Sequence, residues 1–105
     1  MSKSQRTKGA AGEREAAKLL ADLLGVEPIK RRLEQTRDGG YDLDACGIAI
    51  EVKRTERVGL NAALRQVWLA KDDDQLGAVV HRANGEKWKV TMDLDDWCQL
   101  VREAQ

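Results

Sequence analysis

Two short apolar segments joined by the dipeptide Cys46-Gly47 constrain the fold of this chain more than any other feature. Glycine accepts the positive φ of a two-residue hairpin turn, so the dipeptide predicts antiparallel pairing on either side of it. In that register Ala45 lies opposite Ile48, and Asp42 lies opposite Glu51. Like charges placed opposite each other destabilise a hairpin. We therefore expect a cation to lie between the two carboxylates.

Side chains alternate between the two faces of a strand, and this assigns each residue of the second segment to a face. One face carries Ile48, Ile50 and Val52, and the other carries Ala49, Glu51 and Lys53. The first face is the predicted core. The second is a predicted metal site with an ammonium group beside it.

Asp44 is a second candidate ligand because it shares a strand face with Asp42. It lies opposite Ala49 and nearer the turn, so Asp42 is the preferred ligand. The sequence leaves open whether Asp44 contributes in its place.

Composition limits the chemistry that such a domain could carry. The chain has 105 residues, which fits one domain over 1–105 with residues 1–7 as a flexible tail. Cys46 and Cys98 are too far apart for a zinc motif, and His81 is the sole histidine. This scarcity favours carboxylate and metal chemistry over a Ser-His or Cys-His nucleophile. The chain has no apolar run of membrane-spanning length and no signal peptide, so we expect a cytoplasmic protein without a membrane partner.

The net charge of zero hides an asymmetry along the chain. Through Arg37 there are nine Lys and Arg against five Asp and Glu, so 9 − 5 = +4, and the remainder carries −4. Basic residues gather at Lys3-Arg6-Lys8 and Lys30-Arg31-Arg32. Such clusters are typical of phosphate binding, although an ordinary solvated surface explains short clusters equally well.

Periodicity and turn residues predict an α/β fold, with a mixed central β-sheet flanked by helices in the order α-β-β-β-α-β-β-α. The expected elements are a helix over 8–24, strands over 29–35 and within 41–53, a helix over 60–70, strands over 78–80 and 88–92 joined at Asn84-Gly85, and a last helix capped by Asp93.

The apolar stripes of the two later helices are predicted to be buried. They consist of Leu60, Leu64, Val67 and Trp68 in one helix and Leu94, Trp97, Leu100 and Val101 in the other. Trp68, Trp88 and Trp97 are therefore expected in the core, with Cys98 beside Trp97 and His81 opposite Trp88.

Two polar residues interrupt the helical stripes. Glu13 lies in line with Ala17 and Leu20, where a carboxylate is costly unless it is paired. It is either a first-turn acid that complements the helix dipole or a third acidic group at the metal site. Gln66 lies among apolar residues of the helix expected over 60–70. It is either a partly buried amide or a side chain that faces the polar side of the sheet.

The order of these motifs resembles a known family. The pattern Lys8-Gly9-x-x-x-Glu13-Arg14-Glu15, then Arg31-Arg32, then Tyr41-Asp42 and Glu51-Val52-Lys53 is similar to the archaeal-type and phage Holliday junction resolvases of the PD-(D/E)xK nuclease superfamily. The similarity covers about residues 8–70. It implies a restriction-endonuclease-like core. No Pro precedes Asp42, and the segment from Asp42 to Glu51 is short.

The resemblance also implies roles for individual residues. The metal ligands would be Asp42, Glu51, the Val52 carbonyl and Glu13, and the catalytic residues would be Glu13, Asp42, Glu51, Lys53 and Gln66. The DNA-binding residues would be Lys8, Arg14, Arg31, Arg32 and Arg37. Hard oxygen ligands suit Mg²⁺, with Mn²⁺ as a substitute, and no organic cofactor is expected.

The activity implied is Mg²⁺-dependent hydrolysis of phosphodiester bonds in branched DNA, by a homodimer that makes two symmetric cuts. The protein would act in DNA recombination and repair in a bacterial cytosol, and the gene could belong to a phage. Two alternatives stay open: a nuclease of the same superfamily that nicks or degrades other DNA, including duplex DNA, and a catalytically silent nucleic-acid-binding module.

Overall fold

The computed structural model describes residues 3–32 and 40–105, with the backbone alone described for 3–8. The described elements follow the predicted order apart from the first strand. They are α1 (Lys3–Leu24), β1 (Leu43–Ala45), β2 (Ile48–Arg54), α2 (Leu60–Ala70), β3 (Leu76–Arg82), β4 (Lys89–Thr91) and α3 (Leu94–Ala104).

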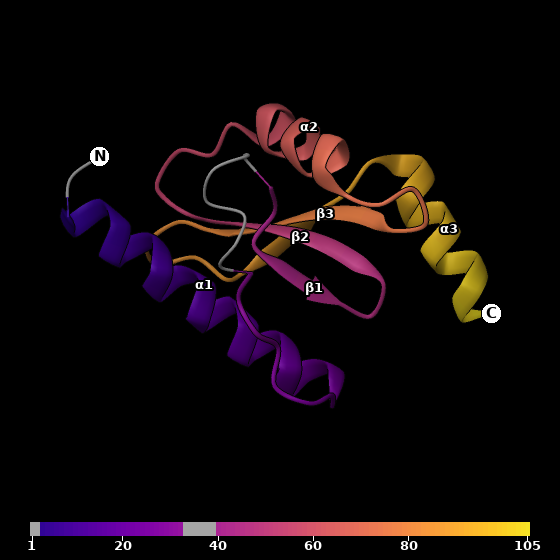
Figure 1. The fold of residues 1–105 in the computed structure, drawn as a ribbon, viewed down its shortest axis with the longest axis horizontal. Helices are drawn as coiled ribbons and strands as arrows, with labels where there is room; N and C mark the ends of the chain where they lie inside the picture. The colour runs from indigo at the N-terminus through magenta and orange to yellow at the C-terminus, as the bar shows by residue number, and fades with distance from the viewer. Residues whose placement is uncertain (1–2, 33–39) are drawn as a thin grey trace.

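The strands form one mixed sheet in the order β1-β2-β3-β4. β2 pairs with β3 in parallel, and both edge pairs are antiparallel. Figure 1 shows α1 and α2 on either side of the sheet, with α3 set apart at one end. The predicted α/β class with a mixed sheet flanked by helices is thus confirmed.

The first hairpin has the predicted register. Ala45 pairs with Ile48 and Leu43 with Ile50, so one further step places Asp42 opposite Glu51. Both turn residues have positive φ, 53° at Cys46 and 80° at Gly47. This combination defines the type I′ turn, whose twist matches that of the strands it joins.

The second hairpin is shifted by one residue from the prediction. His81 pairs with Lys89, and not with Trp88. Gly85 has a φ of 75°, whereas Asn84 is not among the described residues with positive φ, so the turn is not type I′. A different turn adds a residue on the β4 side, and this changes the register.

Each face of the sheet packs against one helix. Ala16 and Ala17 of α1 pack with Ile50, Val52 and Val80.

On the other face, Val67 of α2 packs with Tyr41 and Ala49. A Cβ at Gly77 would lie 2.6 Å from Val67 Cγ1, so the glycine allows α2 to approach β3 closely. The face that carries Ala49 and Glu51 is therefore covered by α2, and it was wrong to expect only one core face.

The N-terminal segments differ from the prediction in their extent. α1 begins at Lys3, so it includes most of the segment expected to be a tail. Of the strand expected over 29–35, the described part shows a single bridge between Arg31 and Leu43, and residues 33–35 lie outside the described residues. No helix in the described ranges is long and apolar enough to span a membrane.

The burial predicted for the later helices was largely wrong. In α2 the buried residues are Ala63 and Val67, whereas Trp68 is 58% exposed. In α3 no described residue is buried, and Trp97 is 52% exposed. Trp88 is partly buried against the α1 face of the sheet. Cys98 is half-buried and not in the core.

Candidate functional site

Asp42 continues the first hairpin beyond β1. Its peptide N–H donates to the Ile50 carbonyl at 2.9 Å, and its Oδ2 accepts a hydrogen bond from the Val52 N–H at 2.8 Å. The carboxylate therefore takes the place of a backbone acceptor at the end of the strand pair. Only 8% of Asp42 is exposed. The hairpin itself fixes the position of this buried carboxylate.

Glu51 lies beside Asp42 and is 3% exposed. Burial, a hydrogen bond with the Asp42 side chain and the charge of Asp42 raise the pKa of Glu51 to about 9, while Lys53 acts in the opposite direction. Lys53 Nζ lies 3.9 Å from Glu51 Oε2. The raised pKa favours the protonated form of Glu51, which can donate a hydrogen bond to the Asp42 carboxylate.

Glu13 reaches the same region from α1. Its Oε1 accepts a hydrogen bond from Arg31 Nε at 3.0 Å. Burial raises the pKa of Glu13, the bond to Arg31 lowers it, and the charge of Asp42 raises it further. Because α1 begins at Lys3, Glu13 lies beyond the first turn, and the helix-dipole interpretation is wrong.

The carboxyl groups do not assemble into a larger ligand cluster. In the residues that the structure describes, no group of three or more His, Cys, Asp or Glu side chains is placed to hold a metal. Glu13 forms an ion pair with Arg31. Asp42 and Glu51 are therefore the two carboxyl groups that lie close enough together to share a ligand.

Two of the predicted DNA-binding arginines share a groove. Arg14 and Arg31 line a depression of about 550 Å³ between α1 and the segment that follows it. Lys18 and Lys30 lie on the same rim, and the floor includes Ala17 and Ile29.

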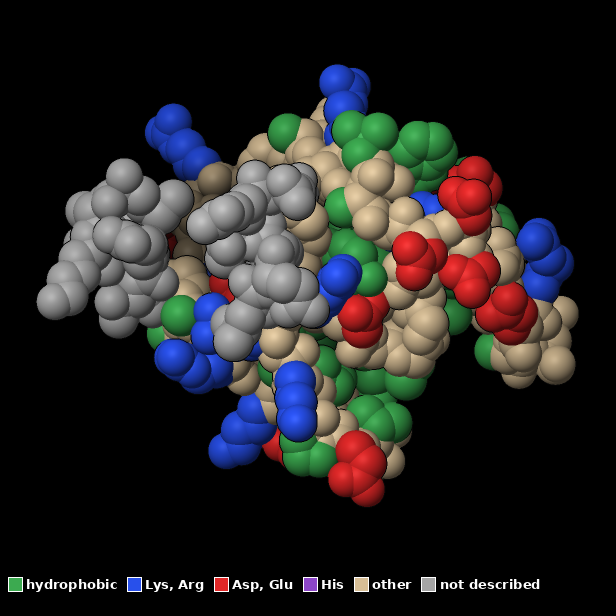
Figure 2. All heavy atoms as spheres, viewed as in Figure 1, with side chains coloured by type: hydrophobic (Ala, Val, Ile, Leu, Met, Phe, Trp, Pro, Cys, Tyr) green, Lys and Arg blue, Asp and Glu red, His purple; other side chains and the backbone are tan. Residues whose placement is uncertain are grey.

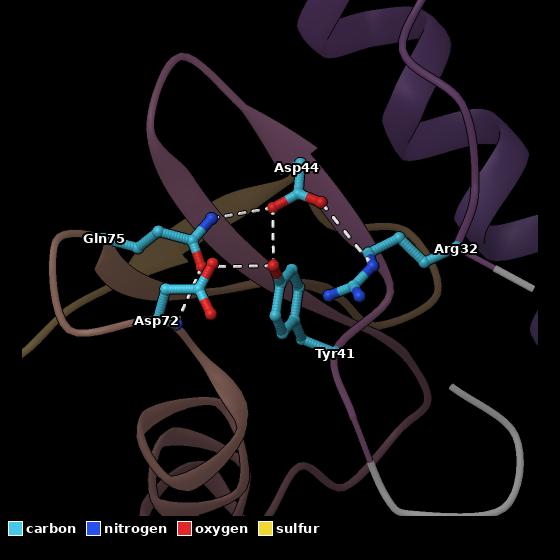
Figure 3. Close-up of polar contacts among 5 residues, drawn as sticks. All are labelled: Arg32, Tyr41, Asp44, Asp72 and Gln75. Carbon is cyan, nitrogen blue, oxygen red and sulfur yellow. Dashed lines mark hydrogen bonds and ion pairs between the residues drawn. The ribbon is translucent and has the colours of Figure 1, made fainter. Parts of the chain in front are cut away.

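Arg32 lies instead in a separate polar cluster, shown in Figure 3. Its guanidinium stacks 4.1 Å from the centre of the Tyr41 ring, and its Nε lies 3.5 Å from Asp44 Oδ2. Asp44 Oδ1 also accepts hydrogen bonds from Tyr41 at 2.7 Å and from Gln75 Nε2 at 2.8 Å. Asp44 therefore anchors the chain on either side of the hairpin.

Lys53 and Gln66 line a second groove, of about 280 Å³, between the end of β2 and the start of α2. Gln66 Nε2 donates to the Gly40 carbonyl at 3.0 Å, so this glutamine holds the chain segment that leads into Asp42. Arg57 lines the same groove.

Several contributions were not predicted from the sequence. Arg57 could have been noticed as a basic residue between the Glu51-Val52-Lys53 strand and the next helix. Gln75 gave no signal, because its hydrogen bonds to Tyr41 and Asp44 join positions far apart in the chain. Arg37 and the Lys8 side chain lie outside the described residues.

The charges also separate in space. Figure 2 shows acidic side chains gathered on the right of the view, over the loop after α2 and the start of α3, whereas most basic side chains lie to the left and below, around α1.

Comparisons with protein families, with curated proteins and with solved structures found no match to this chain.

Proposed function

We propose that this protein is a Mg²⁺-dependent, structure-specific DNA endonuclease with a restriction-endonuclease-like core, and that its main substrate is a four-way junction. The observation that carries the proposal is the buried pair of Asp42 and Glu51, with the Lys53 ammonium 3.9 Å from the second carboxyl group. Burying two adjacent carboxyl groups is costly, and stability alone gives no reason to keep them.

The residues present fit a small divalent cation. Asp42, Glu51 and the Val52 carbonyl offer hard oxygen atoms, which suit Mg²⁺ or Mn²⁺, and Mg²⁺ fills its other positions with water. When bound, the ion would lower the pKa of a water molecule and offset charge on the phosphate. Glu51 must release its proton to act as a ligand, so binding is expected to strengthen with pH.

Other side chains of the protein would bind the phosphates and hold the ligands in position. Lys53 lies beside Glu51 and lines the same groove as Gln66. Its ammonium would therefore offset the negative charge of a phosphate oxygen bound in that groove. Gln66 acts through the Gly40 carbonyl and holds Asp42 in position. Arg14 and Arg31 in one groove and Arg57 in the other would contact flanking phosphates.

One incubation tests this proposal against its alternatives. Purified protein is mixed with a four-way junction, a duplex and a single strand of matched sequence, in Mg²⁺ or in EDTA. We expect cutting of the junction in Mg²⁺ alone. Equal cutting of duplex would favour a general nuclease of the same superfamily. DNA binding without any cutting in Mg²⁺ or Mn²⁺ would favour a binding module, and neither binding nor cutting would reject the proposal.

Glu13→Gln separates a role at the metal from a role at Arg31. Because Glu13 is paired with Arg31, the substitution should release the guanidinium for phosphate contacts and tighten DNA binding several-fold. Cutting should fall only about tenfold, since an outer residue adjusts a site and does not build it. The measurement is competition binding in Ca²⁺ beside single-turnover cleavage in Mg²⁺.

The matched control is Arg31→Ala, which should weaken binding and lower its salt slope by about one unit. A loss of cutting by orders of magnitude in Glu13→Gln, with binding unchanged, would instead return Glu13 to the metal site.

A further inference from the structure

The groove beside α1 has a positively charged rim. Its lining includes two cationic side chains from the helix, Arg14 and Lys18, and two from the segment that follows it, Lys30 and Arg31. Among the described residues that line it, Asp22 is the acid that faces these four cations. A groove with this excess of positive charge attracts an anionic ligand.

The floor of the groove is apolar. Ala17 and Ala21 of α1 lie across from Ile29, and Val26, which is 40% exposed, lies at one end. The described lining contains no aromatic side chain on which a nucleic-acid base could stack. Phosphate groups gain nothing from such a floor, whereas an aliphatic side chain would be buried on it.

The length of the groove follows from two contacts between its walls. The Val26 N–H donates to the Ala21 carbonyl at 3.1 Å, and Arg31 Nε donates to Glu13 Oε1 at 3.0 Å. The segment after α1 therefore runs back along the helix, as Figure 1 shows. Eight helical steps separate Glu13 from Ala21, a rise of about 12 Å. An extended chain covers about 3.3 Å per residue, so about four residues match the groove.

We infer that this groove binds a short, extended, acidic peptide segment of a partner protein, with one apolar side chain on the floor between acidic residues. The carboxylates would bind at Arg14, Lys18 and Arg31, as in other basic sites for acidic motifs. Glu13 holds Arg31 through Nε, so the terminal nitrogens of the guanidinium are positioned to bind a carboxylate. Asp22 repels acids near the Val26 end and so favours the end near Arg14.

The inference does not rest on the proposed nuclease activity, although the two would use common residues. Arg14 and Arg31 are also proposed to contact DNA phosphates, so the peptide and DNA should exclude each other at this groove. Peptide binding by a protein that cuts no DNA would leave the inference intact. Cleavage by a protein that binds no peptide would leave the proposed function intact.

An NMR titration of backbone amides with three capped peptides tests the inference. Asp-Ile-Asp-Asp and Asp-Phe-Asp-Asp carry an apolar side chain, and Asp-Asn-Asp-Asp has the same charge without one. We expect at least one apolar peptide to cause saturable shifts at Ala17, Ala21 and Ile29. The Asn peptide should bind about tenfold more weakly or worse, the scale on which one buried apolar side chain acts. No saturable shift, or equal affinity for the Asn peptide, would overturn the inference.

Two charge variants test the position of the peptide. Lys18→Glu should weaken binding several-fold, and Asp22→Asn should strengthen it several-fold because it removes a repelling carboxylate. A gain in affinity does not arise from misfolding. The matched controls are Lys87→Glu and Asp73→Asn, at exposed positions outside the groove, which should bind like the wild type. Equal responses in the controls, or no response in either groove variant, would overturn the assignment.

A titration with single-stranded DNA in Ca²⁺ separates a peptide groove from a nucleic-acid groove. We expect DNA to shift amides of the basic rim and to leave those of Ala21 and Val26 unchanged. Adding the apolar peptide should then weaken DNA binding, whereas the Asn peptide should do so much less. If DNA shifted Ala21 and Val26 and no peptide did, the groove would be assigned to nucleic acid and the inference rejected.

Discussion

Asp42→Asn and Glu51→Gln are each expected to reduce junction cleavage by more than about 100-fold, the scale on which one preorganised electrostatic group acts. Both substitutions remove a negative oxygen from a site that offers two carboxyl groups and a backbone carbonyl. DNA affinity should persist, because phosphate contacts from the basic grooves supply it. Single-turnover cleavage in Mg²⁺ and competition binding in Ca²⁺ separate the two effects.

Asp44→Asn is the discriminating control for this pair. Asp44 is an aspartate of the same hairpin, but it accepts hydrogen bonds from Tyr41 and Gln75 and faces Arg32. We expect this variant to keep most of the cleavage activity and to lose some thermal stability. If Asp44→Asn were inactive and Asp42→Asn active, the metal would have to be assigned to Asp44. If all three cut normally, the proposed site would be rejected.

Stability should fall as the pH rises through the range in which Glu51 ionises. Its pKa is raised from 4.5 to about 9 in the folded protein, so the folded state holds a proton that the unfolded state has lost. This contribution is fully present below pH 4.5 and is lost progressively as the pH approaches 9. A single proton limits the slope to about 1.4 kcal/mol per pH unit.

Glu51→Gln should remove this dependence, because an amide can donate to Asp42 at every pH. The variant should therefore be more stable than the wild type at pH 8 and similar to it near pH 4.5. Urea unfolding at a series of pH values gives both curves. Glu27→Gln, the same change at an exposed position, is the control and should follow the wild type. If the free energy of unfolding changed with pH in the same way for the wild type and Glu51→Gln, the pH dependence would not come from a proton on Glu51.

The hairpin that holds Asp42 and Glu51 was predictable because all its determinants are local. Cys46-Gly47 fixed the turn, the turn fixed the register, and the period of two assigned the faces. The second hairpin shows the limit of this reasoning. Asn84-Gly85 located the turn, but the backbone angles at Asn84 set the register, and a dipeptide does not specify them.

Long-range relations were less accessible. The stripe of α3 indicates an amphipathic helix, yet periodicity does not say what covers the apolar side, and Trp97 was wrongly assigned to the core. Likewise, the sequence indicated that Glu13 needs a partner but did not identify Arg31. Pairing of charges from different elements depends on where the elements meet in space.

The parallel pairing of β2 with β3 has a consequence for the order of folding. The β1–β2 hairpin closes over a few residues and can form within microseconds, whereas β3 can join only after α2 has bridged the sheet. Both acidic side chains and Lys53 belong to the early hairpin, so their mutual geometry is set before the core is complete. We therefore expect the docking of α2 at Gly77 to follow the hairpin, and substitutions there to change the folding rate without moving the carboxyl groups.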